Sequence, residues 1–334
     1  MTSVLFTCAG QRVDVVTAFA RAGARTIAAD ANALAPAIYH ADVHAIVPRI
    51  ADPGYVPALQ ELIREHDVKL VVPLTDLDQV VLAEHRTELG ALVLLPDVEV
   101  VRRTADKYLT HVFFEEHGIP SPPSWLPDEL PGDLDFPVLV KARFGFGSRD
   151  IYRAESREQL DFFLRYTRAE SFVQQVCAGE EFSIDVFCDL ESRCLNSIPR
   201  TMIESKGGES IKGMTIKDPE LIEFGRLVAE TLEIRGPANV QCFRVAPGRH
   251  EVTDVNPRFG GAFPLPRAAG SRYPELALAL ARGERPEPRL GDFREGVVMT
   301  RFFSHLSLME GAGGGLEPYA EELPEPVAGE PGQA

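Results

Sequence analysis

The feature that most constrains the fold is a repeated alternation in the N-terminal third of the chain. Short apolar runs there are followed by stretches in which apolar residues have helical spacing. The apolar runs are residues 4–6, 26–29, 70–72 and 92–95, and the helical stretches are residues 13–21 and 56–65. Parallel strands need long crossover connections, usually helices. The alternation therefore predicts βαβ units and a parallel sheet, an α/β domain of Rossmann-like type over residues 1–97.

The loop after the first apolar run contains one glycine, Gly10, and Asp30 ends the second run. Dinucleotide-binding folds carry a ribose-binding acid about 20 residues after a glycine-rich turn. Only one glycine of that G-x-G-x-x-G turn is present, so a nicotinamide-dependent enzyme is the weakest interpretation. Ligands of such folds bind at the C-terminal edge of the sheet. We therefore expect Arg12, and Thr75 and Asp76 after the third strand, to contact a substrate.

Composition limits what the chain can bind. Its 334 residues include 50 acidic and 34 basic side chains, giving a net charge of -16, so a broad nucleic-acid-binding face is not expected. The five cysteines are odd in number and lack the spacing of zinc ligands or of a disulfide framework. No apolar run reaches the ~18 residues of a spanning helix, and the N-terminus has no basic leader. We expect a cytoplasmic protein that binds neither nucleic acid nor membrane.

Beyond residue 97, strands and helices occur in separate runs, which predicts an α+β region. A helical pattern over residues 97–114 ends at a proline-rich connection, residues 118–123. Residues 311–334 are rich in Gly, Pro and Glu, and we expect a flexible tail there. The predicted divisions are thus residues 1–97, 98–310 and 311–334.

Candidate phosphate-binding residues surround the predicted strand 138–141. Lys141 ends this strand, and the loop after it contains Gly145, Gly147 and Ser148, whose backbone amides can form a nest for phosphates. No Walker G-x-x-x-x-G-K-[ST] sequence occurs, so this loop is not a P-loop. Glycine and serine are also ordinary turn residues, and a plain hairpin is the competing interpretation.

A second set of candidates lies on two predicted strands near residue 250. Asp254 and Asn256 share one face because side chains alternate along a strand. If the two strands pair, Gln241 joins them, and three such oxygen donors suit Mg²⁺, which takes further ligands from waters and phosphates. Arg258 and Arg267 would stand beside the metal, where a guanidinium suits a phosphate. The competing interpretation is a strand that ends in an Asn-Pro turn.

The order and spacing of these motifs resemble those of ATP-grasp enzymes similar to carbamoyl phosphate synthase, from about Thr7 to Gly283. The matching segments are Asp106-Lys107 and residues 118–122, 136–141, 145–148, 174–175, 179–186, 199–200, 236–241 and 254–261. The resemblance implies an N-terminal pre-ATP-grasp domain and a two-lobed ATP-grasp domain, with a small lobe over about residues 123–188. It also implies ATP and one or two Mg²⁺ ions as cofactors, with Mn²⁺ as a substitute.

The resemblance further implies a role for each matching side chain. The nucleotide would be bound at its phosphates by Lys107, Lys141, Gly145, Gly147 and Ser148, at adenine by Gln174, Gln175, Val176 and Cys177, and at ribose by Glu181. The metal ligands would be Gln241, Asp254 and Asn256. The catalytic residues would be Arg258, Arg200 and Lys141. Arg200 and residues 206–213 would lie nearest the acyl acceptor. The residues expected to contact the small-molecule carboxylate and amine are Arg12, Thr75, Asp76, Lys212 and Arg267.

The chain departs from the family pattern at two positions. Gln175 stands where the family usually has glutamate at the adenine hinge, and Asp254 replaces a glutamate at the metal site. The chain is too short for a whole carbamoyl phosphate synthase and resembles stand-alone ligases of that branch, such as the lysine ligase of pyrrolysine synthesis. The implied reaction is ATP-dependent carboxylate–amine ligation through an acyl phosphate, in a chain compatible with a homodimer.

Two alternatives to this reaction stay open. One is a split carbamoyl phosphate synthase subunit, which would need a partner chain. The other is a nucleotide-binding sensor or accessory protein without turnover, which the changes at Gln175 and Asp254 permit. The eight histidines are scattered along the sequence and predict no general base.

Overall fold

The computed structural model describes residues 1–145, 150–206, 209–302, 304–311 and 314–319, and the chain divides into two compact units. The first unit is residues 1–301, and the second begins at Phe302. The second unit contains a hairpin of β17 (Leu308–Glu310) and β18 (Leu316–Pro318). β18 thus falls in the range expected to be a tail, and residues 320–334 of that range lie outside the described residues.

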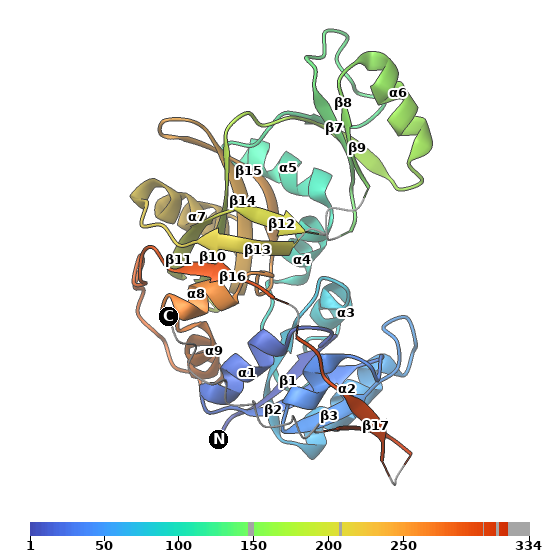
Figure 1. Cartoon of the computed structure of the whole chain (residues 1–334), viewed down its shortest axis with the longest axis vertical. Coiled ribbons are helices and arrows are strands. Elements are labelled where there is room, and N and C mark those ends of the chain that lie inside the picture. The colour runs from blue at the N-terminus through green and yellow to red at the C-terminus, as the bar shows by residue number, and fades with distance from the viewer. Residues whose placement is uncertain (146–149, 207–208, 303, 312–313, 320–334) are drawn as a thin grey trace, which may run out of the picture. The chain divides into compact units, whose positions relative to one another are not determined.

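The first unit begins with a five-stranded parallel sheet in the order β3-β2-β1-β4-β5. Figure 1 labels three of its strands, β1, β2 and β3. Its strands are β1 (Ser3–Thr7), β2 (Arg25–Asp30), β3 (Val43–Ile46), β4 (Val68–Pro73) and β5 (Leu92–Val93). Its helices are α1 (Val13–Arg21), the 3-10 helix η1 (Pro36–His40), α2 (Tyr55–Glu65) and α3 (Gln79–Glu84). The predicted α/β domain with a parallel sheet is confirmed. The short, partly exposed edge strand β3 was not predicted.

Apolar side chains alternate between the two faces of this sheet. Val4 and Phe6 pack with α1 on one face, whereas Leu5 packs with α2 on the other. Helix α9 (Tyr273–Ala281) comes from the far end of the unit and joins α1 on its face. Because both faces are covered, the central strands are buried and appear in the sequence as continuous apolar runs.

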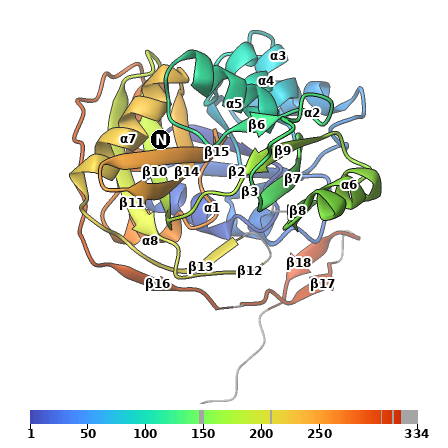
Figure 2. The same cartoon turned by 90° about the horizontal axis from the view of Figure 1, so that it is seen from above.

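A four-stranded antiparallel sheet, in the order β11-β10-β14-β15, forms the central lobe. Its strands are β10 (Glu180–Cys188), β11 (Cys194–Thr201), β14 (Gly236–Ala246) and β15 (Arg249–Asn256). Helix α7 (Pro219–Thr231) packs against β10 and β11 (Figure 2). Asp218 begins this helix, because its side chain accepts hydrogen bonds from the backbone N–H groups of Glu220 and Leu221.

A second antiparallel sheet, in the order β6-β9-β7-β8, forms the small lobe, and α6 (Arg157–Tyr166) packs on it. Its strands are β6 (Ser124–Trp125), β7 (Val138–Ala142), β8 (Ile151–Ala154) and β9 (Ser171–Gln175). A third sheet contains β12 (Glu204–Lys206), β13 (Glu209–Met214) and β16 (Val298–Thr300), and β16 contacts the short helix α8 (Pro264–Ala268). The predicted α+β region after the parallel sheet is confirmed.

The helix predicted over residues 97–114 is two helices, α4 (Val98–Ala105) and α5 (Lys107–Glu116). Asp106 separates them, because its backbone is extended (φ -101°, ψ 105°) and its side chain accepts hydrogen bonds from the N–H groups of Tyr108 and Leu109. The same carboxylate pairs with Arg143 of the small lobe. The break places Lys107 in the first turn of α5, beside the small lobe.

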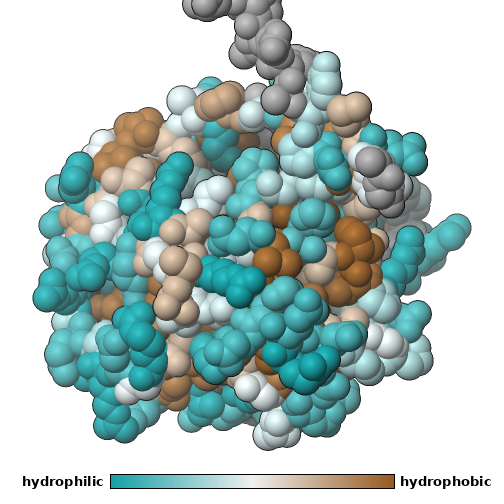
Figure 3. Space-filling view, turned by 90° about the horizontal axis from the view of Figure 1, so that it is seen from below, coloured by the Kyte–Doolittle hydropathy of each residue, from teal (hydrophilic) through white to brown (hydrophobic). Residues whose placement is uncertain are grey.

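One face of the molecule is largely polar. Figure 3 shows a face on which hydrophilic side chains predominate and hydrophobic ones form separate patches. The largest of the fully buried side chains are aromatic and include Tyr55, Tyr273 and Phe6. Within the described ranges, no helix is long and apolar enough to cross a membrane.

Candidate active site

Two lysines surround one carboxylate where α5, β7 and β15 meet. Lys107 Nζ lies 2.7 Å from Asp254 Oδ1, with side-chain exposures of 17% and 20%. Burial lowers the pKa of Lys141 to about 8, with Asp254 opposing the shift and Lys107 adding to it. Burial would raise the pKa of Asp254, but Lys107 and Lys141 bring it below its ordinary value. The cluster holds more positive than negative charge when both lysines are protonated, which suits a polyphosphate.

Oxygen donors of the kind that Mg²⁺ prefers converge on Asp254. The antiparallel register of β14 and β15 places Gln241 opposite Asp254, as expected if the two strands paired. Asn256 Nδ2 lies 3.4 Å from Asp254 Oδ2, so these two side chains share a face. In the part of the chain that the structure describes, no group of three or more His, Cys, Asp or Glu could hold a metal ion. One carboxylate and two amides fit an ion whose remaining ligands come from nucleotide phosphates.

The two glutamines at the end of β9 have different partners. Gln174 Oε1 accepts from Lys141 Nζ at 3.0 Å, and its Nε2 donates to Ser124 Oγ at 3.0 Å. Gln175 Nε2 donates to the carbonyl oxygen of Pro137 at 3.1 Å. Gln174 therefore orients the Lys141 ammonium, a role that the sequence did not indicate. The adenine-binding role of both glutamines stays a prediction.

The other predicted nucleotide residues lie nearby on β10 and in the segment after β9. Glu181 is partly buried, and burial raises the pKa of its carboxyl although Arg200 opposes the shift. Val176 and Cys177 are also partly exposed, and Cys177 Sγ lies 3.5 Å from Glu251 Oε2. Their contacts with adenine and ribose stay predictions.

The predicted phosphate loop and acceptor loop are only partly described. Gly145 is exposed after β7, whereas Gly147 and Ser148 lie outside the described residues, as do residues 207–208 of the acceptor loop. Lys212 pairs with Glu204 across β12 and β13 at 2.6 Å. The loop nearest the proposed acceptor thus begins and ends in paired strands.

Arg200, predicted to be catalytic, takes part in a buried ion pair. Its Nε donates to Asp185 Oδ2 at 2.8 Å, and each side chain is 3% exposed. Asp185 Oδ1 accepts from Asn239 Nδ2 at 3.2 Å. Gly260 packs directly on this carboxylate, since a Cβ atom there would lie 2.5 Å from Asp185 Oδ1. Sequence reasoning missed Asp185, although a charged residue inside a strongly apolar strand was its signal. The catalytic role of Arg200 stays a prediction.

The predicted substrate residues separate into two groups. Asp76 pairs with Arg258 at 3.1 Å, and Thr75 precedes it in the same loop. Arg12 also contacts the segment that carries Arg258. Arg267, in contrast, forms an ion pair with Glu275 of α9 at 2.8 Å. Arg258 is therefore brought together with Arg12 and Asp76, while Arg267 has a different partner.

Two carboxylates stabilise the C-terminal edge of the parallel sheet. Asp30 Oδ2 accepts from the Gly10 N–H and its Oδ1 accepts from the Asn32 N–H, each at 2.8 Å. Asp30 thus holds the turn after β1, which removes the observation that favoured a nicotinamide-binding site. Asp78, at the end of the loop between β4 and α3, is fully buried. Burial raises the pKa of its carboxyl, and Tyr55 Oη donates a hydrogen bond to it at 2.7 Å.

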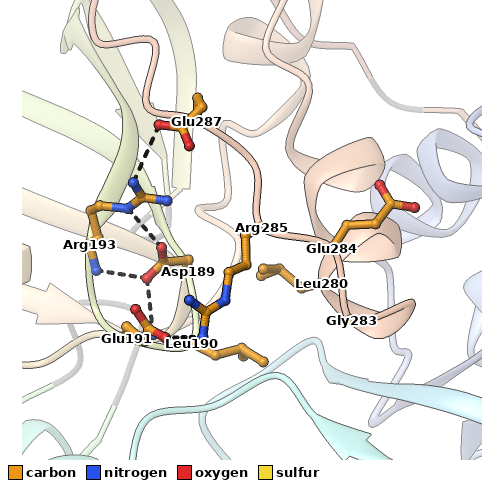
Figure 4. A pocket seen from close by; sticks show the side chains of 9 residues that line it. All are labelled: Asp189, Leu190, Glu191, Arg193, Leu280, Gly283, Glu284, Arg285 and Glu287. Carbon is orange, nitrogen blue, oxygen red and sulfur yellow. Dashed lines mark hydrogen bonds and ion pairs between the residues drawn. The ribbon is translucent and has the colours of Figure 1, made fainter.

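A cavity of about 350 Å³ lies at the turn between β10 and β11, beyond the end of β10 that is distant from Glu181 (Figure 4). Most of its charged side chains pair with one another: Arg193 with Asp189 at 3.0 Å and with Glu287 at 3.4 Å, and Arg285 with Glu191 at 2.8 Å. Glu284 instead pairs with Arg282. These mutual pairs, and the distance along β10 from Glu181, separate this cavity from the candidate site.

Two family models match the chain. Residues 4–94 match a model described as the PylC-like N-terminal domain, and residues 167–302 match one described as ATP-grasp in the biosynthetic pathway with Ter operon. The chain thus contains an ATP-grasp domain. Asp254 lies within the segment that the ATP-grasp model matches, whereas its ion-pair partner Lys107 and the neighbouring Lys141 precede that segment.

Known relatives of this ATP-grasp chain include the carbamoyl-phosphate synthase of Methanobrevibacter smithii. It is 33% identical over 154 residues, 42% of this chain and 40% of that protein. The chain spans 40% and 26% of the lengths of two curated relatives, both carbamoyl-phosphate synthases. It thus corresponds to part of these larger enzymes.

Solved structures confirm the fold. A biotin carboxylase β-γ-ATP complex from Campylobacter jejuni has a TM-score of 0.71 at 15% identity, covering 85% of this chain and 72% of that one. An L-amino acid ligase from Bacillus licheniformis has a TM-score of 0.67 at 17% identity, covering 84% of this chain and 74% of that one. The predicted pre-ATP-grasp domain followed by an ATP-grasp domain is therefore confirmed.

Proposed function

We propose that this ATP-grasp protein is an ATP-dependent carboxylate–amine ligase that works through an acyl phosphate. The observation that carries the proposal is the cluster of Lys107 and Lys141 around Asp254. The amide oxygen donors of Gln241 on β14 and Asn256 on β15 lie beside it. A carbamoyl-phosphate synthase relative and an L-amino acid ligase neighbour support a reaction that uses a small carboxylate or amine.

The mechanism follows from the charges at the site. Lys107 and Lys141 would bind the ATP phosphates, and Glu181 would accept from the ribose hydroxyls. Asp254, with the amide oxygens of Asn256 and Gln241, would hold Mg²⁺, which supplies charge neutralisation on the β- and γ-phosphates. Arg258, oriented by Asp76, would face the transferred phosphoryl group.

Two displacements complete the reaction. An oxygen of the substrate carboxylate attacks the γ-phosphorus, and the bond from that phosphorus to the β–γ bridging oxygen breaks, giving an acyl phosphate and ADP. The amine nitrogen then attacks the carbonyl carbon, the carbon–oxygen bond to phosphate breaks, and the nitrogen loses a proton to solvent. Holding the acyl phosphate and the amine together makes the second step effectively unimolecular.

A second candidate function is carbamoyl phosphate formation from bicarbonate and ammonia. The 33% identity to the Methanobrevibacter smithii enzyme favours it. Because the chain spans less than half of that relative, this function would require a partner chain.

ADP release measured with Mg-ATP and a panel of carboxylates crossed with amines tests the proposal. We expect release that depends on one carboxylate–amine pair and that Lys141→Ala abolishes. Lys69→Ala is the matched control, since Lys69 is an exposed lysine paired with Asp67 outside the site. ADP release with such a carboxylate–amine pair by the purified chain alone would contradict the second candidate, which requires a partner chain. ATP protection without ADP release from any pair would contradict the ligase proposal and favour a sensor.

A further inference from the structure

The loop that follows β15 is held by two side chains of the N-terminal α/β domain, Arg12 before α1 and Gln79 at the start of α3. The carbonyl oxygen of Pro257 accepts from Gln79 Nε2 at 3.2 Å. The carbonyl oxygen of Phe259 accepts from Arg12 Nη1 at 2.9 Å, and that of Gly260 accepts from Arg12 Nη2 at 3.0 Å. Three carbonyl groups in residues 257–260 are thus bound by two side chains that lie more than 170 residues earlier in the sequence.

Side chains of the same loop reinforce this attachment. Phe259 is 1% exposed, and its ring packs edge-to-face with Phe19 of α1 at 5.9 Å and with Phe263 at 4.8 Å. Arg258, the neighbouring residue, instead forms its ion pair with Asp76. Phe259 therefore anchors the loop in the core of the parallel sheet, while Arg258 is oriented toward the loop after β4.

Arg12 has little hydrogen-bonding capacity left for a substrate. Its Nε and Nη2 donate to the two carboxylate oxygens of Asp14, each at 3.0 Å, in addition to the two bonds with the loop. A guanidinium has five N–H donors, so these four bonds use most of them. The side chain is 15% exposed. Gln79 is 4% exposed and donates to Pro257 within the buried interior.

The held loop continues directly from the proposed metal ligands. Arg258 N–H donates to the carbonyl oxygen of Asn256 at 2.8 Å, so the loop and the end of β15 form one turn. A displacement of this loop would move Arg258 and Asn256 together. Partners that orient the ligands of a metal, without touching it, typically affect metal affinity or activity by about 10- to 100-fold.

We propose that Arg12 and Gln79 are positioning residues, which fix the loop 257–260 and thereby place Arg258 and Asn256 for the ATP site. The effect on turnover depends on the proposed ligase function. The effects on the loop and on Mg²⁺-dependent ATP binding do not depend on it. Arg12 acts on catalysis through the loop and not by contacting the acyl or amine substrate.

The test compares two variants with two matched controls. Arg12→Lys keeps the charge but cannot bridge two carbonyls and Asp14, and Gln79→Leu keeps the size but removes the donor. The controls are Arg64→Lys, in an exposed pair with Glu61, and Gln60→Leu, whose Nε2 also donates to a carbonyl but on the exposed surface. The readouts are hydrogen exchange of residues 256–263, the Mg²⁺ concentration for half-maximal thermal protection by ATP, and kcat and KM for ADP release.

We expect faster exchange in residues 256–263 and a Mg²⁺ requirement raised about 10-fold or more in both variants. We also expect kcat to fall by about 10- to 100-fold while KM for the carboxylate changes little, with both controls like the parent. Parent-like exchange and Mg²⁺ dependence together with a raised carboxylate KM for Arg12→Lys would overturn the proposal. If Arg12→Lys does not fold, Gln79→Leu decides. If the parent releases no ADP, the ligase proposal fails. Hydrogen exchange of residues 256–263 and the Mg²⁺ dependence of thermal protection by ATP then still test whether Arg12 and Gln79 position the loop.

Discussion

Raising the pH from 7 to 9 should weaken ATP binding through Lys141. Burial is the main reason that the pKa of this lysine falls to about 8 in the free protein, and Lys107 adds to the shift. The phosphates of bound ATP are anions beside its ammonium group, and they return the pKa toward or above its ordinary value of 10.5. Binding above pH 7 is therefore coupled to the uptake of a proton by Lys141.

The size of the effect follows from the pKa of Lys141. With a pKa of about 8, roughly 0.9 of the free protein carries the charged lysine at pH 7 and roughly 0.1 at pH 9. ATP affinity should therefore fall about tenfold across this range, which is about 1.4 kcal/mol. At pH 8 binding should take up about half a proton. Phosphate groups titrate near pH 6 and contribute little to this change.

The same shift predicts how the stability of the free protein depends on pH. Because the folded pKa of Lys141 lies below the ordinary value, the unfolded chain binds more protons between about pH 8 and pH 10.5. The contribution of Lys141 to the free energy of unfolding should therefore rise across that window. Bound ATP should remove this contribution, because it restores the charged lysine in the folded state.

Isothermal titration calorimetry of Mg-ATP at pH 8, in two buffers with different ionisation enthalpies, measures the proton uptake directly. Lys141→Gln should abolish the uptake and the pH dependence, whereas Lys69→Gln, outside the site, should leave both like the parent. A parent protein whose ATP affinity is the same at pH 7 and pH 9, with no proton uptake at pH 8, would refute the reasoning.

Substitutions at three positions test other parts of the site. Asp254→Asn removes the one carboxylate proposed as a metal ligand, so ADP release should fall by orders of magnitude at any Mg²⁺ concentration. Asp254→Glu keeps the carboxylate and should lower ADP release modestly. Parent-like release by the Asn variant would show that Asp254 is not a metal ligand. Gly260→Ala should destabilise the fold by about 1–3 kcal/mol in urea unfolding, since its Cβ would meet Asp185 at 2.5 Å, and unchanged stability would contradict this packing. Arg200→Met should cost about 3–5 kcal/mol because it leaves the buried Asp185 unpaired; full stability with lost turnover would instead support a catalytic Arg200.

Local patterns in the sequence were sufficient for much of the fold. The parallel sheet follows from strands buried on both faces, which appear as continuous apolar runs. The pairing of β14 with β15 brings Gln241 opposite Asp254, as alternation along the two strands suggested. These features depend on residues that are close in sequence or on one short hairpin. Over such short separations, the periodicity and spacing of apolar and polar residues predict structure.

The hydrogen-bond and ion-pair partners of the charged side chains could not be predicted from such local patterns. Arg12 binds carbonyl groups 247 and 248 residues away, and nothing near Arg12 in the sequence indicates that contact. The pairing of Asp185 with Arg200 depends on the register of β10 against β11, and β11 was not predicted. The break at Asp106 was a local signal, since aspartate often begins helices, but the apolar pattern continued across it.

Oxygen transfer from carboxylate to phosphate tests the central proposal most directly. The substrate carboxylate that supports ADP release would be labelled with ¹⁸O, and the inorganic phosphate released in the presence of the amine would be analysed by mass spectrometry. An acyl phosphate requires that one carboxylate oxygen leave with the phosphoryl group, so each phosphate released should carry one ¹⁸O atom. Unlabelled phosphate accompanied by product formation would contradict the acyl-phosphate mechanism.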